Sequence, residues 1–208
     1  IIFSKLNKLT KTPMSGFLKT NNFYLMSSSP ERFIKKTGNK VISQPIKGTA
    51  KRDSILNKDL KIRDKLKNDP KERSENIMIV DLVRNDLSKF SIPGSVKVTE
   101  LCEVYPFKQV NQMISTVESK VRNNKNLVDV LKSSFPMGSM TGAPKIEALK
   151  IIDDLEVSRR GVYSGSMGYI DPNGNFDFNV IIRSILYDSS KKILSFQVGS
   201  AITSSSKP

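Results

Sequence analysis

Strand-like runs joined by short turns occupy both ends of this 208-residue chain, and helical patterns lie between them. Residues 23–49 hold short apolar stretches separated by the turn Lys36-Thr37-Gly38-Asn39, which is typical of a β-hairpin region. The runs 161–170, 176–187 and 193–203 are also separated by turns, so we expect an antiparallel meander there. Because strands and helices do not alternate, a doubly wound parallel sheet is excluded. The pattern predicts an α+β fold of mainly antiparallel sheet with helices packed on it.

Three segments in the middle of the chain have helical patterns. Asp69-Pro70-Lys71-Glu72 combines a cap residue, a proline at the first helical position and a glutamate three residues after the cap, so it predicts a helix to about Phe90. A second helix is expected from Lys108 to Val121, and a third from Gly142-Ala143-Pro144 onward. The expected core-facing stripes are Ile77, Val80, Val83, Arg84 and Leu87, then Val110, Met113, Ile114 and Val117, then Ile146, Leu149, Ile152 and Leu155. Residues 50–68 are polar and lysine-rich and predict an exposed connection that could hold one weak helix.

Composition narrows the chemistry that is open to the chain. There is no histidine and a single cysteine, Cys102, so an internal disulfide is excluded and catalysis rests on carboxylates, amines, amides or a hard cation. The setting of Cys102 favours a half-buried strand thiol without a chemical role. No apolar run approaches the ~20 residues of a membrane span, so we expect no membrane partner. The start lacks an export signal, which favours a cytoplasmic location.

The net charge of +14 raises the question of a polyanionic partner. The basic residues are spread along the chain, lysine outnumbers arginine, and no stretch alternates aromatic residues with arginine as nucleic-acid binding surfaces do. We therefore expect no nucleic-acid partner. A non-catalytic basic binding module is kept as an alternative hypothesis.

Several residues have two interpretations when each is taken alone. The small-residue loop Gly138–Lys145 enters a helix whose free amides suit a carboxylate or phosphate, but a capped helix start explains it equally well. Arg183 lies in an apolar strand-like run and needs an anionic partner, either a structural acid or a substrate carboxylate. For Tyr163, a core aromatic with a bonded hydroxyl is the ordinary interpretation.

The same holds for the charged candidates. Glu72 and Glu75 would share a helix face and could hold one hard cation, but Glu72 also completes a capping box with Asp69. Lys47 follows a strand and precedes a glycine, where nearby positive charge would favour its neutral, nucleophilic amine. Most lysines, however, are solvated surface charges.

Taken together and in this order, these segments resemble the chorismate-utilising enzymes, which include anthranilate, aminodeoxychorismate, isochorismate and salicylate synthases. The resemblance runs through nearly the whole chain. The motifs that carry it are Ser29-Pro30-Glu31-Arg32-Phe33, Pro45-Ile46-Lys47-Gly48-Thr49, the run from Glu75 to Leu87, Thr141-Gly142-Ala143-Pro144-Lys145, Arg160-Gly161-Val162-Tyr163-Ser164-Gly165 and Ile182-Arg183. It implies a magnesium enzyme built as an α/β sandwich of antiparallel sheets that binds chorismate between them.

The resemblance also implies roles for individual residues. Glu31 would be the acid that assists departure of the C4 hydroxyl of chorismate, and Glu72 and Glu75 would lie on Mg²⁺. Tyr163 and Arg183 would meet a substrate carboxylate. The pocket would be completed by Ser139, Thr141, Gly142, Ala143, Lys145 and Gly199.

Lys47 distinguishes among the members of the family. Anthranilate and isochorismate synthases typically have alanine at this place, whereas aminodeoxychorismate synthases have a lysine that adds to C2 before ammonia enters at C4. The resemblance therefore implies conversion of chorismate and ammonia to 4-amino-4-deoxychorismate, on the route to p-aminobenzoate and folate. Ammonia would come from a glutamine amidotransferase subunit. The alternative is the anthranilate synthase large subunit of tryptophan biosynthesis.

The chain departs from the family in two places. Gln112 stands where the family usually has histidine, and glutamine donates a hydrogen bond but exchanges no proton. A second glutamate pair that the family places on the metal would follow the stretch 199–203, and the chain stops before it. We therefore expect residues 1–208 to be one partial catalytic domain, short of its N-terminal portion and its C-terminal end, and inactive on its own.

Overall fold

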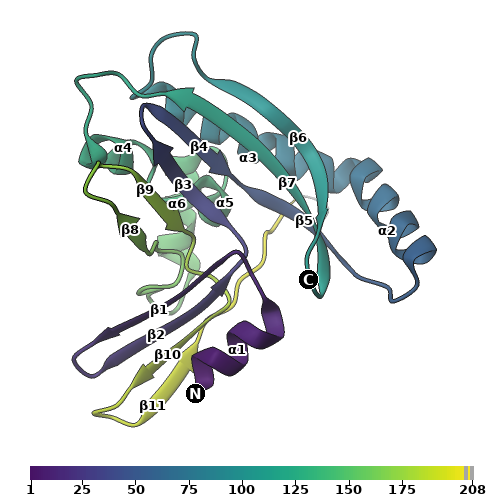
Figure 1. Ribbon diagram of the computed structural model, residues 1–208, viewed down its shortest axis with the longest axis vertical. Coiled ribbons are helices and arrows are strands. Elements are labelled where there is room, and N and C mark those ends of the chain that lie inside the picture. Colours follow the sequence, from purple (N-terminus) through teal and green to yellow (C-terminus); the bar gives the residue numbers. More distant parts are fainter. Residues whose placement is uncertain (204–205, 207–208) are drawn as a thin grey trace.

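The computed structural model describes residues 1–203 and 206, and this part of the chain forms two antiparallel sheets with helices packed on them (Figure 1). The expected α+β class is therefore confirmed. The smaller sheet has the order β1 (Met14–Thr20), β2 (Phe23–Ser29), β10 (Ser184–Asp188) and β11 (Ile193–Phe196). The larger sheet has the order β5 (Ile46–Lys51), β7 (Val110–Lys120), β4 (Lys40–Gln44), β3 (Arg32–Thr37), β9 (Phe176–Asn179) and β8 (Gly168–Ile170), and β6 (Lys97–Pro106) also pairs with β7. The helices are α1 (Ile2–Thr10), α2 (Leu56–Asn68), α3 (Pro70–Ser88), α4 (Leu127–Ser134), α5 (Gly138–Thr141) and α6 (Lys145–Leu155).

The chain passes between the two sheets at two neighbouring places. Residues 30–31 lead from β2 of the smaller sheet into β3 of the larger one, and residues 180–183 lead from β9 into β10. The Val180 amide donates to the Glu31 carbonyl at 3.1 Å, so the two crossings lie side by side. The expected single meander over residues 161–203 is therefore wrong. It is two hairpins in different sheets, because Val180 bonds Glu31 and Ile181 bonds Gly165 instead of continuing β9.

The predicted helix from Lys108 to Val121 is wrong, since residues 110–120 form strand β7. This strand pairs with β6 along one edge and with β4 and β5 along the other. Residues 111–117 are all buried, so both faces of the strand are covered and the apolar–polar alternation that marks a half-exposed strand is lacking. The helical spacing of Val110, Met113, Ile114 and Val117 was a coincidence within a run that is buried throughout.

Residues 50–68 are more ordered than expected. Most of the second half forms helix α2, which packs against β5 and β6. The buried carboxylate of Asp59 accepts hydrogen bonds from the Arg52 guanidinium, the Asn111 amide and the Asp53 backbone. These bonds lower the pKa of Asp59 to about 2, with Arg52 as the largest cause. An ion pair within the segment, bonded to Asn111 of β7, therefore orders residues whose own composition is only weakly helical.

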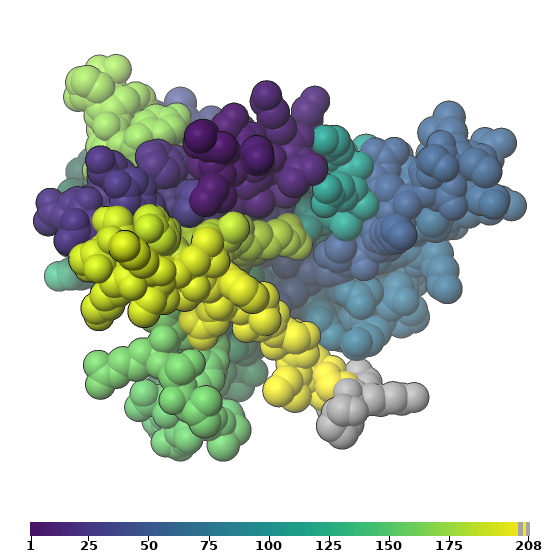
Figure 2. Space-filling model, turned by 90° about the horizontal axis from the view of Figure 1, so that it is seen from below, coloured from purple at the N-terminus to yellow at the C-terminus, as the bar shows by residue number. Residues whose placement is uncertain are grey.

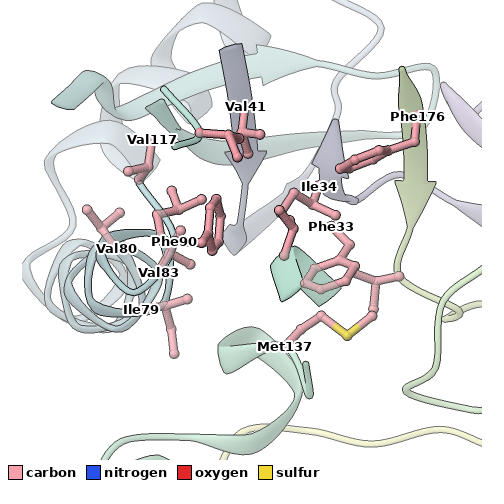
Figure 3. Packing of buried hydrophobic residues seen from close by; sticks show 14 residues of the cluster. Phe33, Ile34, Val41, Ile79, Val80, Val83, Phe90, Val117, Met137 and Phe176 are labelled. Atoms are coloured by element: carbon pink, nitrogen blue, oxygen red, sulfur yellow. The ribbon is translucent and has the colours of Figure 1, made fainter. Parts of the chain in front are cut away.

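Helix α3 supplies one wall of the main core and begins as predicted, with Asp69 as the cap residue. Its buried face holds Ile79, Val80, Val83 and Leu87, which pack with Phe90, Val117 and the residues of β3 and β4 shown in Figure 3. The predicted stripe is half right. Ile77 and Arg84 point outward, and the polar residues Asn76 and Asp86 occupy the buried face instead.

The third predicted helix is confirmed as α6, although none of its residues is fully buried. Ile146 and Leu155 of its expected stripe are 64% and 74% exposed. Cys102 lies in β6 as expected, but it is completely buried. Within the described residues, no helix is both long and apolar enough to cross a bilayer.

The packing predicts that Phe90→Ala lowers the free energy of unfolding by about 3–5 kcal/mol, because it leaves a large cavity in the main core. Phe90 is 0% exposed, whereas Phe196 at the edge strand β11 is 69% exposed and serves as the matched control. Denaturant unfolding of the full-length protein measures both variants. Equal losses for Phe90→Ala and Phe196→Ala would contradict this assignment of the core.

Candidate active site

Glu31 lies at the first crossing between the sheets, with its side chain buried. Burial raises the pKa of its carboxyl to about 7, while hydrogen bonds from the Ser139 hydroxyl and the Ile46 amide and the charges of Lys47 and Arg183 oppose that rise. These neighbours come from three parts of the chain that are far apart in sequence. A carboxyl with this pKa is partly protonated at neutral pH and is suited to act as an acid.

Lys47 lies in β5 beside this carboxyl. Its ammonium donates to the backbone carbonyl of Ser139 at 3.1 Å, and its side chain is half-buried. The pairing of β5 with β7 shifts register between Ile46 and Thr49, and Gly48 has a φ of +95°. The strand therefore bulges at Lys47-Gly48, and a bulge of this kind redirects a side chain.

Ser139 contacts both of these groups. Its hydroxyl bonds Glu31 and its carbonyl accepts from Lys47. Ser139 belongs to the short helix α5, which packs so closely on α3 that a Cβ on Gly138 would lie 2.6 Å from Leu82. The small residue at 138 is therefore needed to bring Ser139 to this position. A cavity beside Glu31 and Ser139 extends toward Asp86 and Ser134.

Glu72 and Glu75 project from the first turns of α3 toward the same region. A Cβ on Gly48 would lie 3.3 Å from Oε2 of Glu72, so this carboxylate abuts the bulge in β5. Burial raises the pKa of Glu72, and the charge of Glu75 raises it further. The Asp69 side chain caps α3 by accepting from the Lys71 and Glu72 amides, while the Asp69 amide donates to Leu66. The cap bonds of α3 therefore come from Asp69, and the Glu72 carboxylate takes no part in them.

A carboxylate that burial and a neighbouring carboxylate make harder to ionise is suited to a bound cation, and carboxylate oxygen atoms are the ligands that Mg²⁺ prefers. Within the described part of the chain, no three acidic, cysteine or histidine side chains gather as a metal site. Glu72 and Glu75 would therefore supply only part of a magnesium shell.

Arg183 is placed differently from the expected strand position. It lies in the bend just before β10, with a φ of +51°. With the Gln112 amide oxygen turned toward it, both terminal guanidinium nitrogens donate to that oxygen at 3.2 Å. Gln112 is completely buried, whereas Arg183 stays exposed to solvent. The glutamine therefore holds the guanidinium from behind and leaves its open side for an anion.

The other predicted pocket residues have different surroundings. Tyr163 and Gly199 are adjacent, since a Cβ on Gly199 would lie 2.7 Å from the Tyr163 hydroxyl, and burial raises the pKa of that hydroxyl. Gly199 belongs to the C-terminal stretch of the chain. This stretch is drawn in yellow in Figure 2 and runs across the face seen there. Thr141 bonds the carbonyls of Met137 and Gly138 in its own turn.

Lys145 has a structural partner. Its ammonium pairs with the buried carboxylate of Asp86 and donates to the Ser134 carbonyl at 3.3 Å. Gly142 has a φ of +134°, and the exposed Ala143 follows it on the turn into α6. Substrate contacts by the loop from Ser139 to Lys145 stay a prediction. The backbone of Gly142 and Ala143 is better suited to such contacts than the Lys145 side chain, which is already paired.

Two contributions were missed from the sequence. The Gln112–Arg183 pair joins residues that are distant along the chain, and no local pattern connects them. Asn76 is a fully buried amide on α3, where it bonds the Lys47 carbonyl at 3.4 Å. A polar residue next to an apolar helical stripe was the available signal for Asn76, although the prediction took the neighbouring Ile77 as the inward-facing residue.

The gathered groups suit a small substrate that bears carboxylates. Glu31 offers a proton near neutral pH, Lys47 offers an amine, Arg183 offers a bidentate guanidinium, and Glu72 with Glu75 offers a cation site. A buried carboxyl, an amine and a guanidinium therefore meet where the chain crosses between the sheets.

Known proteins share similarity with most of this chain. Residues 1–208 match the family described as chorismate binding enzyme. The chain is 42% identical over 183 residues to aminodeoxychorismate synthase component 1 of Salmonella typhimurium. The aligned region covers 88% of this chain and 40% of that protein. It is also 37% identical over 207 residues to anthranilate synthase component 1 of Saccharolobus solfataricus. That aligned region covers 100% of this chain and 49% of that protein.

Among solved structures, anthranilate synthase component I from Streptococcus pneumoniae matches with a TM-score of 0.80 at 31% identity, over 88% of this chain and 40% of that chain. This chain thus spans between two fifths and one half of the length of these relatives. The family match extends over every residue, and the expected resemblance is confirmed. The chain belongs to the chorismate binding enzyme family.

Proposed function

We propose that the protein converts chorismate and ammonia to 4-amino-4-deoxychorismate, as an aminodeoxychorismate synthase component 1. The observation that carries the proposal is the position of Lys47, whose amine is held by the Ser139 carbonyl next to the buried carboxyl of Glu31. An amine beside an acid can form a covalent bond to the ring while the acid protonates the leaving hydroxyl. The relative from Salmonella typhimurium, with this activity in its name, supports the proposal.

The proposed reaction has two balanced steps. In the first, neutral Lys47 forms a bond from Nζ to C2, the ring double bonds shift, and the C4–O bond breaks as Glu31 gives its proton to form water. In the second, ammonia bonds to C4, the double bonds shift back, and the C2–Nζ bond breaks to restore the neutral lysine amine. The new C4 ammonium then gives one proton to the Glu31 carboxylate, which restores the acid. Each step forms one bond to nitrogen and breaks one bond, so no oxidant or reductant is needed.

Arg183 and Tyr163 would bind a carboxylate of chorismate, with Gln112 fixing the guanidinium from behind. Glu72 and Glu75 would hold Mg²⁺, which when bound neutralises substrate carboxylate charge. We further propose that ammonia comes from a separate glutamine amidotransferase subunit, because relatives are named as component 1 of a synthase.

Anthranilate synthase is the second candidate. It is favoured by the Saccharolobus solfataricus relative, which covers the whole chain at 37% identity, and by the fold match to the Streptococcus pneumoniae enzyme. Mass spectrometry of the product that the full-length protein forms from chorismate, Mg²⁺ and ammonium separates the two. Anthranilate as the product would overturn the first proposal.

Lys47→Ala is expected to lower formation of 4-amino-4-deoxychorismate on the order of 1,000-fold or more, while chorismate still binds, because it removes the nucleophile and no carboxylate contact. Steady-state kinetics and chorismate titration measure the two effects. Lys51→Ala, at an exposed lysine on the same strand, is the matched control. Undiminished turnover in Lys47→Ala would show that ammonia attacks without covalent help.

The raised pKa of Glu31 predicts a pH dependence of stability. The folded state binds this proton more tightly than the unfolded state, because the pKa rises from 4.5 to about 7 on folding. The stabilisation is therefore complete below pH 4.5 and is lost as the pH rises through about 7. We expect the free energy of unfolding of the wild type to fall over this range relative to Glu31→Gln, measured by denaturant unfolding in EDTA.

The exposed Glu147→Gln is the control for that comparison. It should follow the wild type across the whole pH range. A wild type and a Glu31→Gln variant whose stabilities run parallel from pH 4.5 to about 7 would show that Glu31 titrates normally.

The cation site predicts that Glu72→Gln and Glu75→Gln each weaken Mg²⁺ binding by about 10-fold or more, because each removes a carboxylate ligand. Isothermal titration calorimetry of the full-length protein with chorismate present measures the affinity. Glu147→Gln again serves as the control. Unchanged Mg²⁺ affinity in both helix variants would remove these residues from the metal site.

A further inference from the structure

Two β-bulges lie on opposite edges of β7, at successive positions that meet at Ile114. On one edge, Ile46 pairs with Ile114 and Thr49 with Gln112, so β5 holds one residue more than the strand opposite. On the other edge, Glu100 pairs with Thr116 and Glu103 with Ile114, so β6 also holds one extra residue. Lys47 lies in the first bulge. Cys102, with a φ of +57°, lies in the second.

A single buried side chain connects both bulges to helix α3. Asn76 is 0% exposed, and its amide nitrogen donates to the carbonyls of Lys47 at 3.4 Å and Met113 at 3.5 Å. Its amide oxygen accepts from the Ser115 hydroxyl and, at 3.7 Å, from the Cys102 thiol. The Ser115 oxygen in turn accepts from the Cys102 amide at 2.9 Å. Every polar atom of the Asn76 amide is therefore used.

The position of Asn76 along α3 matters for the site. It follows Glu75 directly and lies one helical turn after Glu72, so the residue that bonds the Lys47 carbonyl belongs to the helix segment that carries both carboxylates. A bulge is a local irregularity that the sheet ladder does not hold in place, so its conformation depends on such side-chain bonds. The Ser115 hydroxyl determines which way the Asn76 amide faces, because it donates and so requires the oxygen on its side.

We propose that Asn76, oriented by Ser115, is a positioning residue that holds the Lys47 bulge in register with the carboxylates of α3. This inference rests on the proposed function of Lys47 as the nucleophile. Asn76 does not reach the substrate itself. It acts by fixing the backbone from which the Lys47 amine extends to the Glu31 pocket, where a displacement of about 1 Å lowers the rate on the order of 100-fold.

Ser115→Ala is the sharpest test, because it removes one hydroxyl and leaves Asn76 and Lys47 in place. Ser119→Ala is the matched control, since Ser119 is also buried on β7 but bonds Ser91 and lies away from Asn76. Asn76→Ala extends the test by removing the whole amide. All variants are made in the full-length protein, with thermal unfolding recorded for each.

Two readouts separate positioning from general packing. We expect Ser115→Ala to lower kcat about 10-fold to 100-fold with chorismate affinity unchanged. The second readout is the labelling rate of Lys47 by an acetylating reagent, relative to Lys51 on the same strand, measured by peptide mass spectrometry. We expect that ratio to change in Ser115→Ala and Asn76→Ala and to stay at the wild-type value in Ser119→Ala.

Wild-type kcat and labelling ratio in Ser115→Ala would overturn the proposal, as would equal effects in Ser119→Ala. If Asn76→Ala fails to fold, Ser115→Ala decides alone. The labelling ratio does not depend on which reaction the protein performs. A shifted ratio in a protein that makes no 4-amino-4-deoxychorismate therefore supports the positioning role and refutes the proposed function, whereas an unshifted ratio in an active protein does the reverse.

Discussion

The burial of the Glu31 carboxyl is the constraint on which the site depends. A carboxyl removed from water needs donors or nearby positive charge, and here it has the Ser139 hydroxyl, the Ile46 amide and the charges of Lys47 and Arg183. These groups come from β5, from α5 and from the bend before β10. They do not fully offset the loss of water, so the carboxyl keeps a proton near neutral pH. The same burial that opposes ionisation thus brings the proposed acid, the amine and the guanidinium into one place.

The strand β7 provides the frame around this carboxyl. It is covered on both faces and paired on both edges, so its position is strongly determined. In a regular strand, side chains alternate between the two faces of the sheet, and Lys47 would follow that alternation. The bulge next to Gly48, held by Asn76 from α3, changes that alternation locally. Rigid strands with one pinned irregularity are a suitable scaffold for a group that must be placed to within a fraction of an ångström.

Two lysines of the expected pocket show how geometry assigns roles to residues of the same type. Lys145 meets the buried carboxylate of Asp86, and this ion pair ties α6 to α3. Lys47 instead donates to the backbone carbonyl of Ser139 and lies beside the Glu31 carboxyl. The structure thus gives Lys145 a structural partner and places Lys47 in the candidate site.

Local signals in the sequence were sufficient for the starts of α3 and α6, for the hairpins near both ends and for the family, because caps, prolines, turns and motifs act within a few residues. They also named Glu31 and Lys47 as candidates. They were misleading for β7, whose burial on both faces removes the alternation that marks a strand. The division of the last strands between two sheets, the support of Arg183 by Gln112 and the pairing of Lys145 with Asp86 all join distant residues. Such pairings are decided only when the chain has folded, because their free energy comes from desolvation and hydrogen bonding between segments that no local pattern connects.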